Sequence, residues 1–251
     1  MRIIQSPRLA GFAHGFTTRR GGASEEPYDT LNLGGLVGDA PARVAENWAR
    51  LEAETRLGFA RVRQVHGARA VRAGAPCAPQ EEADAVVSLA AGVAACVAIA
   101  DCVPVLLADP ETGAVAAVHA GWRGTVARAA AEGVRRLAEE TGAPPSRLLA
   151  AIGPSIGPCC YEVSADLAAR FEEALGPAVV RAGKAPRLDL WASNVAVLRA
   201  AGVPADRVEV LGRCTSCERE LFFSHRRDAG RTGRHVAFIA PRAPTRGVAV
   251  P

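Results

Sequence analysis

The sequence predicts a mixed α/β fold, of the α+β kind, in which layered, mixed β-sheets are flanked by helices. Apolar runs of strand length outnumber segments with helical spacing, and several of these runs follow one another directly along the chain. This order argues against a regular alternation of strand and helix, which would predict a doubly wound parallel sheet. The chain shows no internal repeat and no clear linker, so we expect one domain over residues 1–251.

The amino-terminal part of the chain is expected to be mostly loop, followed by a helix. Residues 11–38 are rich in Gly, Thr, Asn and Arg and have little apolar periodicity. From Pro41, which suits a first helical turn, apolar residues recur at helical spacing. These residues are Val44, Trp48 and Leu51. We therefore expect a helix that begins near Pro41.

The middle of the chain predicts a series of strands. Short apolar runs indicate strands at residues 61–65, 70–73, 85–88, 94–100, 103–108 and 114–119. Within the apolar stretch 85–100, residues 91–92 predict a turn. The segment Asp109–Gly113, with the sequence DPETG, is typical of a hairpin turn and joins the last two strands.

The second half of the chain adds helices and further strands. A stripe of small and branched apolar residues after Gly124 predicts a long helix. Ser164 is a suitable N-cap for a helix that ends near Leu175, and another helix is expected over residues 189–200. We expect the tail after Pro241 to fray. Strands are expected at residues 148–152, 208–211 and 235–239, and a loop at 176–187.

Composition excludes several classes of protein. The formal net charge is +4, and the aromatic residues, 5% of the chain, do not alternate with Arg, so we expect no nucleic-acid partner. The longest weakly polar stretch, residues 85–100, is too short for a membrane span, and the amino terminus resembles no secretory signal. With seven cysteines and no such signal, we expect a reduced, cytoplasmic protein, monomeric or homodimeric.

Three side chains are candidates for a catalytic metal site: His66 in QVHG, Cys102 in ADCVP and His119 in VHAGWRG. Each alone is also explained as a structural histidine or a small buried hydrophobic residue. Counting back from the hairpin turn places Cys102–Val103 opposite His119–Ala120, which makes the Cys and the second His neighbours. Two His and one Cys suit Zn²⁺, which leaves a fourth position for water and lowers its pKa to about 7. The same ligands suit Cu²⁺, the alternative metal.

The remaining cysteines offer a rival metal site. Cys214 and Cys217 form a C-x-x-C motif, but a structural zinc site of this type needs a second pair. The adjacent Cys159 and Cys160 could supply it, although they precede the motif by more than fifty residues. The sequence therefore disfavours a structural zinc site, and we expect no catalytic role for Cys214 or Cys217. A thioredoxin-like redox pair lacks the expected strand–motif–helix context.

Guanidinium groups beside glycine residues are candidates for binding an anion. Arg19 lies in TTRRGG and Arg123 in HAGWRG, where glycine lets backbone N–H groups approach an oxyanion. Because the chain has thirty basic residues, an ordinary surface Arg is the competing interpretation. We expect both residues to bind substrate, with phosphate at one of them.

Taken together, the motifs resemble the laccase-domain family, also known as the polyphenol oxidase or purine nucleoside phosphorylase family. They occur in family order over nearly the whole chain. The matching segments are HGFTTRRGG (14–22), LNLG (31–34), QVHG (64–67), ADCVPVLLADP (100–110), VHAGWRG (118–124), IGPSIGPCCYEV (152–163), and CTSC with FFSHRRD and TGR (214–234).

The resemblance implies both a fold and an activity. The fold is a layered α/β domain, distantly similar to the catalytic domains of deamidating toxins. The resemblance implies that His66, Cys102 and His119 bind zinc in the active site, and it adds Asn32 of LNLG to the substrate-binding residues. The implied enzyme is a purine nucleoside phosphorylase that cleaves adenosine, inosine and 5′-methylthioadenosine with phosphate and also deaminates adenosine.

Two alternative functions stay open. A copper-dependent polyphenol oxidase of the multicopper type would use about ten His residues, whereas this chain has five. An amidase would use Cys102 as nucleophile and His119 as base. Metal dependence separates these classes, because chelation inactivates a zinc enzyme whereas alkylation inactivates a thiol enzyme.

Overall fold

The structure, a computed structural model, describes residues 1–242. Within this range the strands are β1 (Ile3–Ile4), β2 (Ala13–Thr17), β3 (Gly58–Ala60), β4 (Ala70–Ala73), β5 (Ala85–Ser88), β6 (Val93–Ile99), β7 (Val103–Ala108), β8 (Val115–Ala120), β9 (Leu149–Ile152), β10 (Val180–Arg181), β11 (Arg187–Leu188), β12 (Val208–Val210) and β13 (His235–Ala240). The α-helices are α1 (Pro41–Thr55), α2 (Trp122–Val126), α3 (Ala129–Thr141), α4 (Ala165–Leu175) and α5 (Leu190–Ala200). The predicted fraying after Pro241 concerns residues that lie almost wholly outside the described range.

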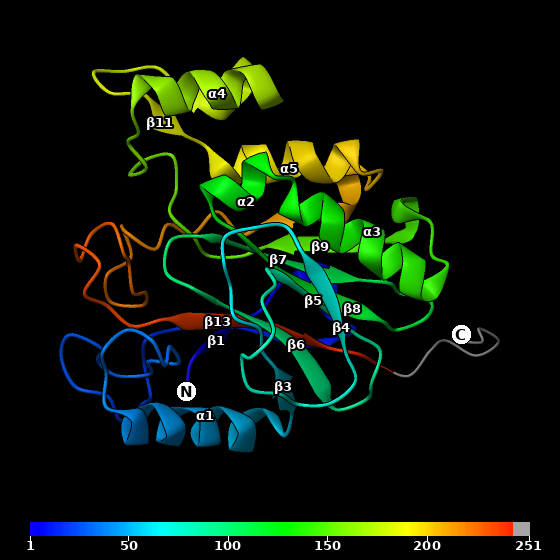
Figure 1. Ribbon diagram of the computed structural model, residues 1–251, viewed down its shortest axis with the longest axis vertical. Coiled ribbons are helices and arrows are strands. Elements are labelled where there is room, and N and C mark those ends of the chain that lie inside the picture. Colours follow the sequence, from blue (N-terminus) through cyan, green and yellow to red (C-terminus); the bar gives the residue numbers. More distant parts are fainter. Residues whose placement is uncertain (243–251) are drawn as a thin grey trace.

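The strands form two mixed sheets that lie face to face between helices (Figure 1). The five-stranded sheet has the order β1-β2-β13-β6-β3, and the six-stranded sheet has the order β12-β9-β7-β8-β5-β4. Helix α1 covers the outer face of the first sheet, and helices α2, α3 and α5 cover that of the second. Helix α4 and the small β10-β11 sheet lie farther out. This layered arrangement confirms the predicted fold class.

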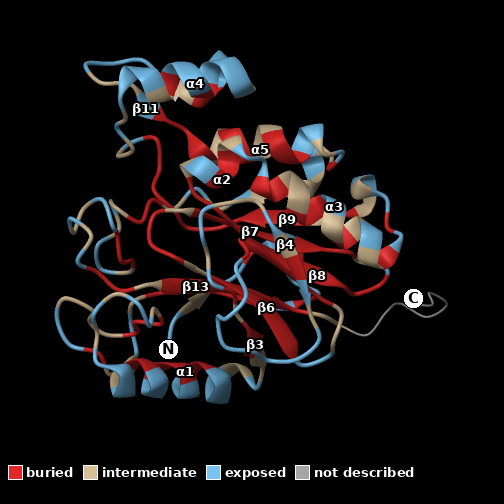
Figure 2. Cartoon of the chain, in the orientation of Figure 1, coloured by how far each residue is buried: buried red, intermediate tan, exposed pale blue. Residues whose placement is uncertain are grey.

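Three apolar clusters hold the layers together. The cluster between the two sheets includes Phe16 and Leu106. The cluster between the six-stranded sheet and its helices includes Val118 and Leu137, and the cluster under α1 includes Trp48. Figure 2 shows the result, with buried strands and with α1 buried only along its inner side. Each fully buried aliphatic or aromatic side chain contributes roughly 1.5–3 kcal/mol.

Several predicted elements are confirmed closely. Helix α1 begins at Pro41, and the segment Asp109–Gly113 lies in the turn of the β7–β8 hairpin. Ser164 caps α4, because its side chain accepts a hydrogen bond from the N–H of Leu167. Gly92 forms the predicted turn with a φ of 76°, but the strands on its two sides belong to different sheets. The turn therefore carries the chain from one sheet to the other.

The structure departs from the expected elements in several places. Residues 11–38, which were expected to be mostly loop, also contain β2, which pairs with β13 near the other end of the chain. Residues 61–65 form no strand, although the Gln64 side chain exchanges hydrogen bonds with the backbone of Ala98 in β6. The long helix after Gly124 is two helices, because Arg128 adopts a left-handed conformation (φ 61°) between α2 and α3.

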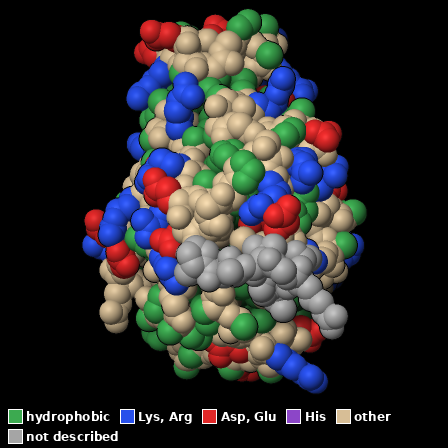
Figure 3. All heavy atoms as spheres, turned by 90° about the vertical axis from the view of Figure 1, so that its right-hand side faces the viewer, with side chains coloured by type: hydrophobic (Ala, Val, Ile, Leu, Met, Phe, Trp, Pro, Cys, Tyr) green, Lys and Arg blue, Asp and Glu red, His purple; other side chains and the backbone are tan. Residues whose placement is uncertain are grey.

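Charges of both signs are interspersed on the face that Figure 3 shows, which is the side where α3 lies. On this helix Arg135 forms ion pairs with Glu132 and Glu139. Exposed pairs of this kind contribute little to stability, because solvent screens them. Among residues 1–242, no helix has the length and the apolar character needed to cross a bilayer.

Candidate metal centre

Three side chains from different parts of the chain converge beside the six-stranded sheet. His66 lies in the loop between β3 and β4, Cys102 directly precedes β7, and His119 lies in β8. Their ligand atoms all lie within 4.8 Å of one another. The structure thus brings together the three residues that the sequence analysis singled out as metal ligands.

The register of the β7–β8 hairpin differs by one residue from the prediction. Val103 pairs with Ala120 and Pro104 pairs with His119, because the ladder begins one step later, at Val115. The N–H of Asp109 donates to the carbonyl of residue 114, which keeps that residue inside the turn. Residues two apart along a strand share a face, so the observed register places Cys102, two before Pro104, on the side of His119.

Asp84, a buried carboxylate just before β5, organises both histidines. Its Oδ1 accepts a hydrogen bond from Nδ1 of His119 at 2.8 Å, which leaves Nε2 of that ring free to bind a metal. The same carboxylate accepts hydrogen bonds from the N–H groups of Val65, His66 and Gly67 at 3.3, 2.9 and 2.7 Å. One side chain therefore fixes the orientation of one ligand and the backbone of the other.

Two backbone features allow the ligands to approach one another. His66 has a φ of 60°, in the left-handed region that is uncommon for residues other than glycine and often marks functional sites. Gly121 lies directly beside the cluster. A Cβ at this position would come 2.8 Å from Sγ of Cys102 and 3.3 Å from Cδ2 of His66. Only glycine therefore leaves the ligands undisturbed.

The charges of Cys102 and His119 are coupled. Burial opposes the thiolate, but the charge of His119 and hydrogen bonds from His119 and His66 lower the pKa of Cys102 to about 6. Burial likewise opposes the imidazolium, but Cys102 and Asp84 raise the pKa of His119 to about 9. The site thus favours a thiolate, which is the form of cysteine that binds metals.

The three ligands border a cavity of about 1340 Å³. Five Arg side chains also line the cavity, namely Arg61, Arg63, Arg123, Arg226 and Arg234. The guanidinium of Arg123 lies 4.3 Å from the ring centroid of Trp122. Tyr161 lines the cavity as well, and burial and the nearby Cys102 raise its pKa to about 12, so its phenol keeps its proton at neutral pH. The cavity thus combines cations, aromatic rings and an edge formed by the three candidate metal ligands.

Two residues expected to bind substrate do not line this cavity. The guanidinium of Arg19 donates hydrogen bonds to the carbonyl and carboxylate of Asp29 and to the carbonyl of Arg219. The buried Asn32 bonds to Gly34, to Asp39 and to the N–H of Arg234. Both side chains hold loops in place, so the structure does not place them among the residues that face this cavity.

Three residues that line or support the site were missed by sequence reasoning. Asp84 had a weak signal, since it is an isolated carboxylate at the start of a buried strand. Tyr161 and Arg234 lie inside the quoted motifs IGPSIGPCCYEV and TGR but were not singled out. Their placement at the cavity depends on loops whose paths the sequence pattern does not predict.

Comparison with known proteins places the chain in a family. Residues 13–242 match the sequence profile of the family described as multi-copper polyphenol oxidoreductase laccase. The chain belongs to this laccase family. The expected resemblance to the laccase-domain family is therefore confirmed.

Relatives in the laccase family are named as purine nucleoside phosphorylases. A purine nucleoside phosphorylase of Deinococcus radiodurans is 46% identical over 241 residues, which cover 94% of this chain and 92% of that protein. Purine nucleoside phosphorylase YlmD of Geobacillus stearothermophilus is 39% identical over 258 residues, covering 94% and 93%. The crystal structure of YlmD from that organism superposes with a TM-score of 0.88 at 38% identity and 94% coverage of both chains.

The histidines of this chain do not fit the copper content that the laccase family description suggests. His14 and His235 bond to backbone groups elsewhere in the fold. His225 lines the cavity but does not belong to the ligand cluster. Only His66 and His119 remain as clustered imidazoles among the described residues, far fewer than the roughly ten of a multicopper oxidase. The donor set does fit a single Zn²⁺ or Cu²⁺ ion.

Proposed function

We propose that this chain is a zinc-dependent purine nucleoside phosphorylase that cleaves adenosine, inosine and 5′-methylthioadenosine with phosphate and also deaminates adenosine. The observation that carries the proposal is the convergence of His66, Cys102 and His119 at the edge of a large cavity. The names of the relatives in the laccase family support the nucleoside and phosphate substrates.

The ligand set supports a catalytic site more than a structural one. Three protein ligands leave one position of a tetrahedral ion open, and structural zinc sites are closed by four. A bound Zn²⁺ would supply Lewis-acid polarisation at that position. His66 and Cys102 would hold the ion, and Asp84 would keep His119 in the orientation that presents Nε2 to it.

The cavity also offers groups for a nucleoside and for phosphate. Tyr161 and Trp122 provide aromatic surface for a purine base. Arg123 is exposed in the cavity wall four residues after His119, so it can meet an anion close to the metal. Arg19 gives no such support, because its guanidinium is taken up by Asp29 and backbone carbonyls.

The first test is a product assay on metal-analysed protein. Adenosine with phosphate should yield adenine and ribose 1-phosphate, and adenosine without phosphate should yield inosine and ammonia. Both activities should disappear on chelation and return with Zn²⁺. The proposal would be overturned if folded, zinc-loaded protein formed neither product.

The second test separates phosphate binding from loop structure. Arg123→Ala should raise the KM for phosphate at least tenfold and leave deamination, which consumes water, largely unchanged. Arg19→Ala is the matched control, and it should change thermal stability without changing the KM for phosphate. A phosphate KM that is unaltered in Arg123→Ala would exclude this residue as the phosphate ligand.

A cysteine amidase is the second candidate, because Cys102, His119 and Asp84 form a nucleophile–base–carboxylate series. The lowered pKa of the Cys102 thiol suits this role when no metal is bound. Hydrolysis of a glutamine side-chain amide by metal-free protein, abolished by iodoacetamide, would favour it. Activity only in the zinc-loaded form would reject it.

A further inference from the structure

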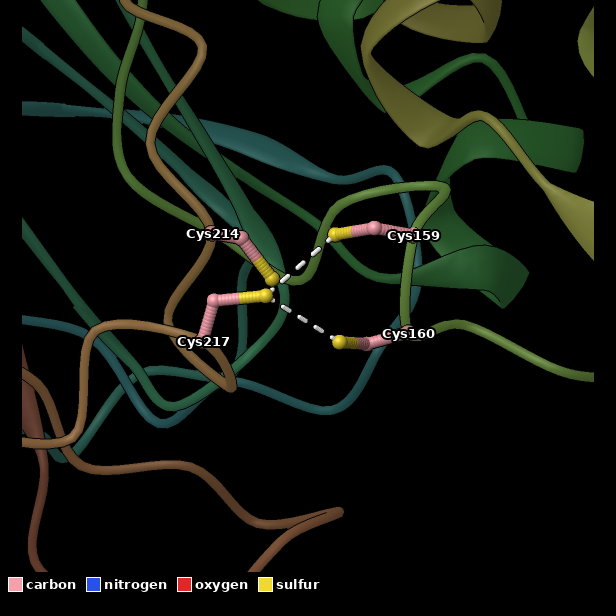
Figure 4. Close-up of side chains that lie close together, drawn as sticks. All are labelled: Cys159, Cys160, Cys214 and Cys217. Atoms are coloured by element: carbon pink, nitrogen blue, oxygen red, sulfur yellow. Dashed lines mark hydrogen bonds between the residues drawn. The ribbon is translucent and has the colours of Figure 1, made fainter.

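Four cysteines converge outside the candidate metal centre. Cys159 and Cys160 lie in the turn after β9, and Cys214 and Cys217 lie in the loop after β12. Figure 4 shows the four side chains pointing toward one another from these two loops. All four sulfur atoms lie within 4.8 Å of one another. We propose that the four cysteines bind a structural Zn²⁺ ion that joins the two loops.

The distances between the sulfur atoms fit one ion. Sγ of Cys217 lies 3.5 Å from Sγ of Cys159 and 3.4 Å from Sγ of Cys160. Around a tetrahedral zinc with Zn–S bonds of about 2.3 Å, neighbouring sulfur atoms are separated by about 3.8 Å. Small side-chain adjustments therefore suffice to place all four sulfurs on one ion. The same spacing is too narrow for a cluster that carries several irons between its cysteines.

The backbone holds the two loops together independently of a metal. Ser155 and Cys214 form an isolated parallel β-bridge. The N–H of Ser155 donates to the carbonyl of Arg213, and the N–H of Thr215 donates to the carbonyl of Ser155. Because the loops already lie side by side, binding an ion costs little further ordering of the chain. The fifty-residue separation that counted against this site in the sequence is thus overcome by pairing after β9 and β12.

Hydrogen bonds and charge also suit a thiolate site. The N–H of Gly157 donates to Sγ of Cys214 at 3.2 Å, the kind of support that metal-bound thiolates receive. Four neighbouring thiolates repel one another, and a divalent cation at their centre offsets that repulsion.

Zinc accounts for the whole cluster, whereas a disulfide does not. All seven cysteines are free, and a single disulfide would leave two of these four thiols unused. A closed set of four cysteines is the ligand pattern of structural zinc sites. Soft thiolate ligands also suit Cu(I) and iron, and the metal analysis below distinguishes those ions.

The proposed ion lies next to loops that form the cavity wall. Ile156 and Tyr161, on either side of the first cysteine pair, both line the cavity. The N–H of Ile156 donates to the carbonyl of Asp101, and the hydroxyl of Thr215 donates to its carboxylate at 2.6 Å. Asp101 directly precedes Cys102. We expect the ion to stabilise this part of the wall without taking part in the chemistry.

Metal content of purified full-length protein is the first test. Wild-type protein should contain two zinc ions per chain, and Cys159→Ser/Cys217→Ser should contain one. His66→Ala/His119→Ala should also contain one ion, in that case the structural one. Cys77→Ser removes an exposed cysteine outside both clusters and should keep both ions. With Co²⁺ in place of zinc, the sulfur-to-metal charge-transfer absorption should disappear mainly in the Cys159/Cys217 variant. The proposal would be overturned if wild-type protein contained one zinc ion per chain and the Cys159→Ser/Cys217→Ser variant contained the same amount. Copper or iron in place of the second zinc ion would also overturn it.

Differential alkylation of wild-type protein tests the same site without any variant. In zinc-loaded protein Cys159, Cys160 and Cys217 should resist iodoacetamide, and after chelation they should be labelled, as read by mass spectrometry of peptides. The exposed Cys77 should be labelled in both states and serves as internal control. Labelling of the three cysteines regardless of zinc, or a disulfide between the two loops, would reject a zinc site. Neither result depends on which reaction the enzyme catalyses.

Discussion

At the scale of single residues, Asp84 holds two parts of the candidate centre in position. It bonds to the ring of His119 and to three successive N–H groups around His66, so it positions two ligands from different elements. Because it is fully buried, no water can take over these bonds when it is replaced. The geometry of the centre therefore depends on a residue that does not touch the metal position.

Asp84→Asn should weaken Zn²⁺ binding by about 10–100-fold. An amide keeps the shape of the side chain, but it provides one acceptor oxygen where the carboxylate provides two, so the bonds to His119 and the His66 loop cannot all form. Titration against a metal-binding dye measures the affinity. Asp166→Asn, at the exposed start of α4, is the control and should leave the affinity unchanged. Equal affinities for the two variants would show that Asp84 has no positioning role.

Gly121→Ala should also disrupt the centre, through space instead of hydrogen bonding. The added methyl group would lie 2.8 Å from Sγ of Cys102, so the thiol must move out of reach of the shared ligand position. We expect a substantial loss of bound zinc with little change in thermal stability. Gly74→Ala is the matched control, because a Cβ at that position meets no atom within 4 Å. Zinc retained by Gly121→Ala at the wild-type level would contradict this steric argument.

At the scale of elements, the β7–β8 hairpin connects fold and site, since it carries His119 and follows Cys102. Its turn is closed by Asp109, which is fully buried and accepts hydrogen bonds from Thr112 and from Arg147. Although burial opposes ionisation, these bonds hold the pKa of Asp109 below its usual range. The guanidinium of Arg147 therefore joins the turn to the segment that leads into β9.

Arg147→Met should lower the free energy of unfolding by about 2–4 kcal/mol, because it leaves the buried carboxylate of Asp109 without its cation. Urea unfolding at neutral pH measures the change. Arg135→Met, which breaks exposed ion pairs on α3, should lower the free energy of unfolding far less, because solvent screens those pairs. Similar losses in both variants would mean that the Arg147 pair behaves as a surface pair.

At the scale of the whole molecule, β13 pairs with strands that are far from it in the sequence. It pairs with β2 on one side and with β6 on the other, and it begins at the fully buried His235. Nε2 of this ring accepts a hydrogen bond from the N–H of Phe223 at 2.6 Å. Burial, reinforced by the charges of Arg19 and Arg234, lowers the pKa of His235 to about 3. The central strand of one sheet thus starts at a histidine that must stay neutral in the folded state.

Stability should consequently fall as the pH drops from about 6.5 toward 3. In this window the unfolded chain binds a proton at His235 and the folded chain does not, so each pH unit costs about 1.4 kcal/mol from this group. Its contribution is fully present above pH 6.5. Urea unfolding at several pH values between 7 and 4.5 gives the free energy of unfolding as a function of pH. The slope of this free energy against pH should be shallower for His235→Gln than for wild type. The slope of the control His225→Gln, at an exposed position, should match wild type, and an unchanged slope in His235→Gln would disprove the assignment.

Individual helices, strands and turns could be predicted because the pattern of neighbouring residues determines them. Helix α1 begins at the expected Pro41, the strands β5 and β7 have the expected bounds, and DPETG closes the expected hairpin. The candidate metal ligands could be singled out for a related reason. Histidine and cysteine residues at strand ends and in recognisable motifs indicate metal binding from the sequence alone.

Pairings between distant segments were decided only by the tertiary structure. β2 became a strand because β13 lies beside it, and the hairpin register moved by one residue because hydrogen bonds within the turn retain Ala114. The convergence of the four cysteines and the role of Asp84 are of the same kind. Side-chain periodicity reports which face of an element is apolar, but it carries no information on which distant backbone supplies the hydrogen-bonding partners. The sequence by itself therefore determined the elements and the ligand types, and the packing of two sheets decided which of those residues meet.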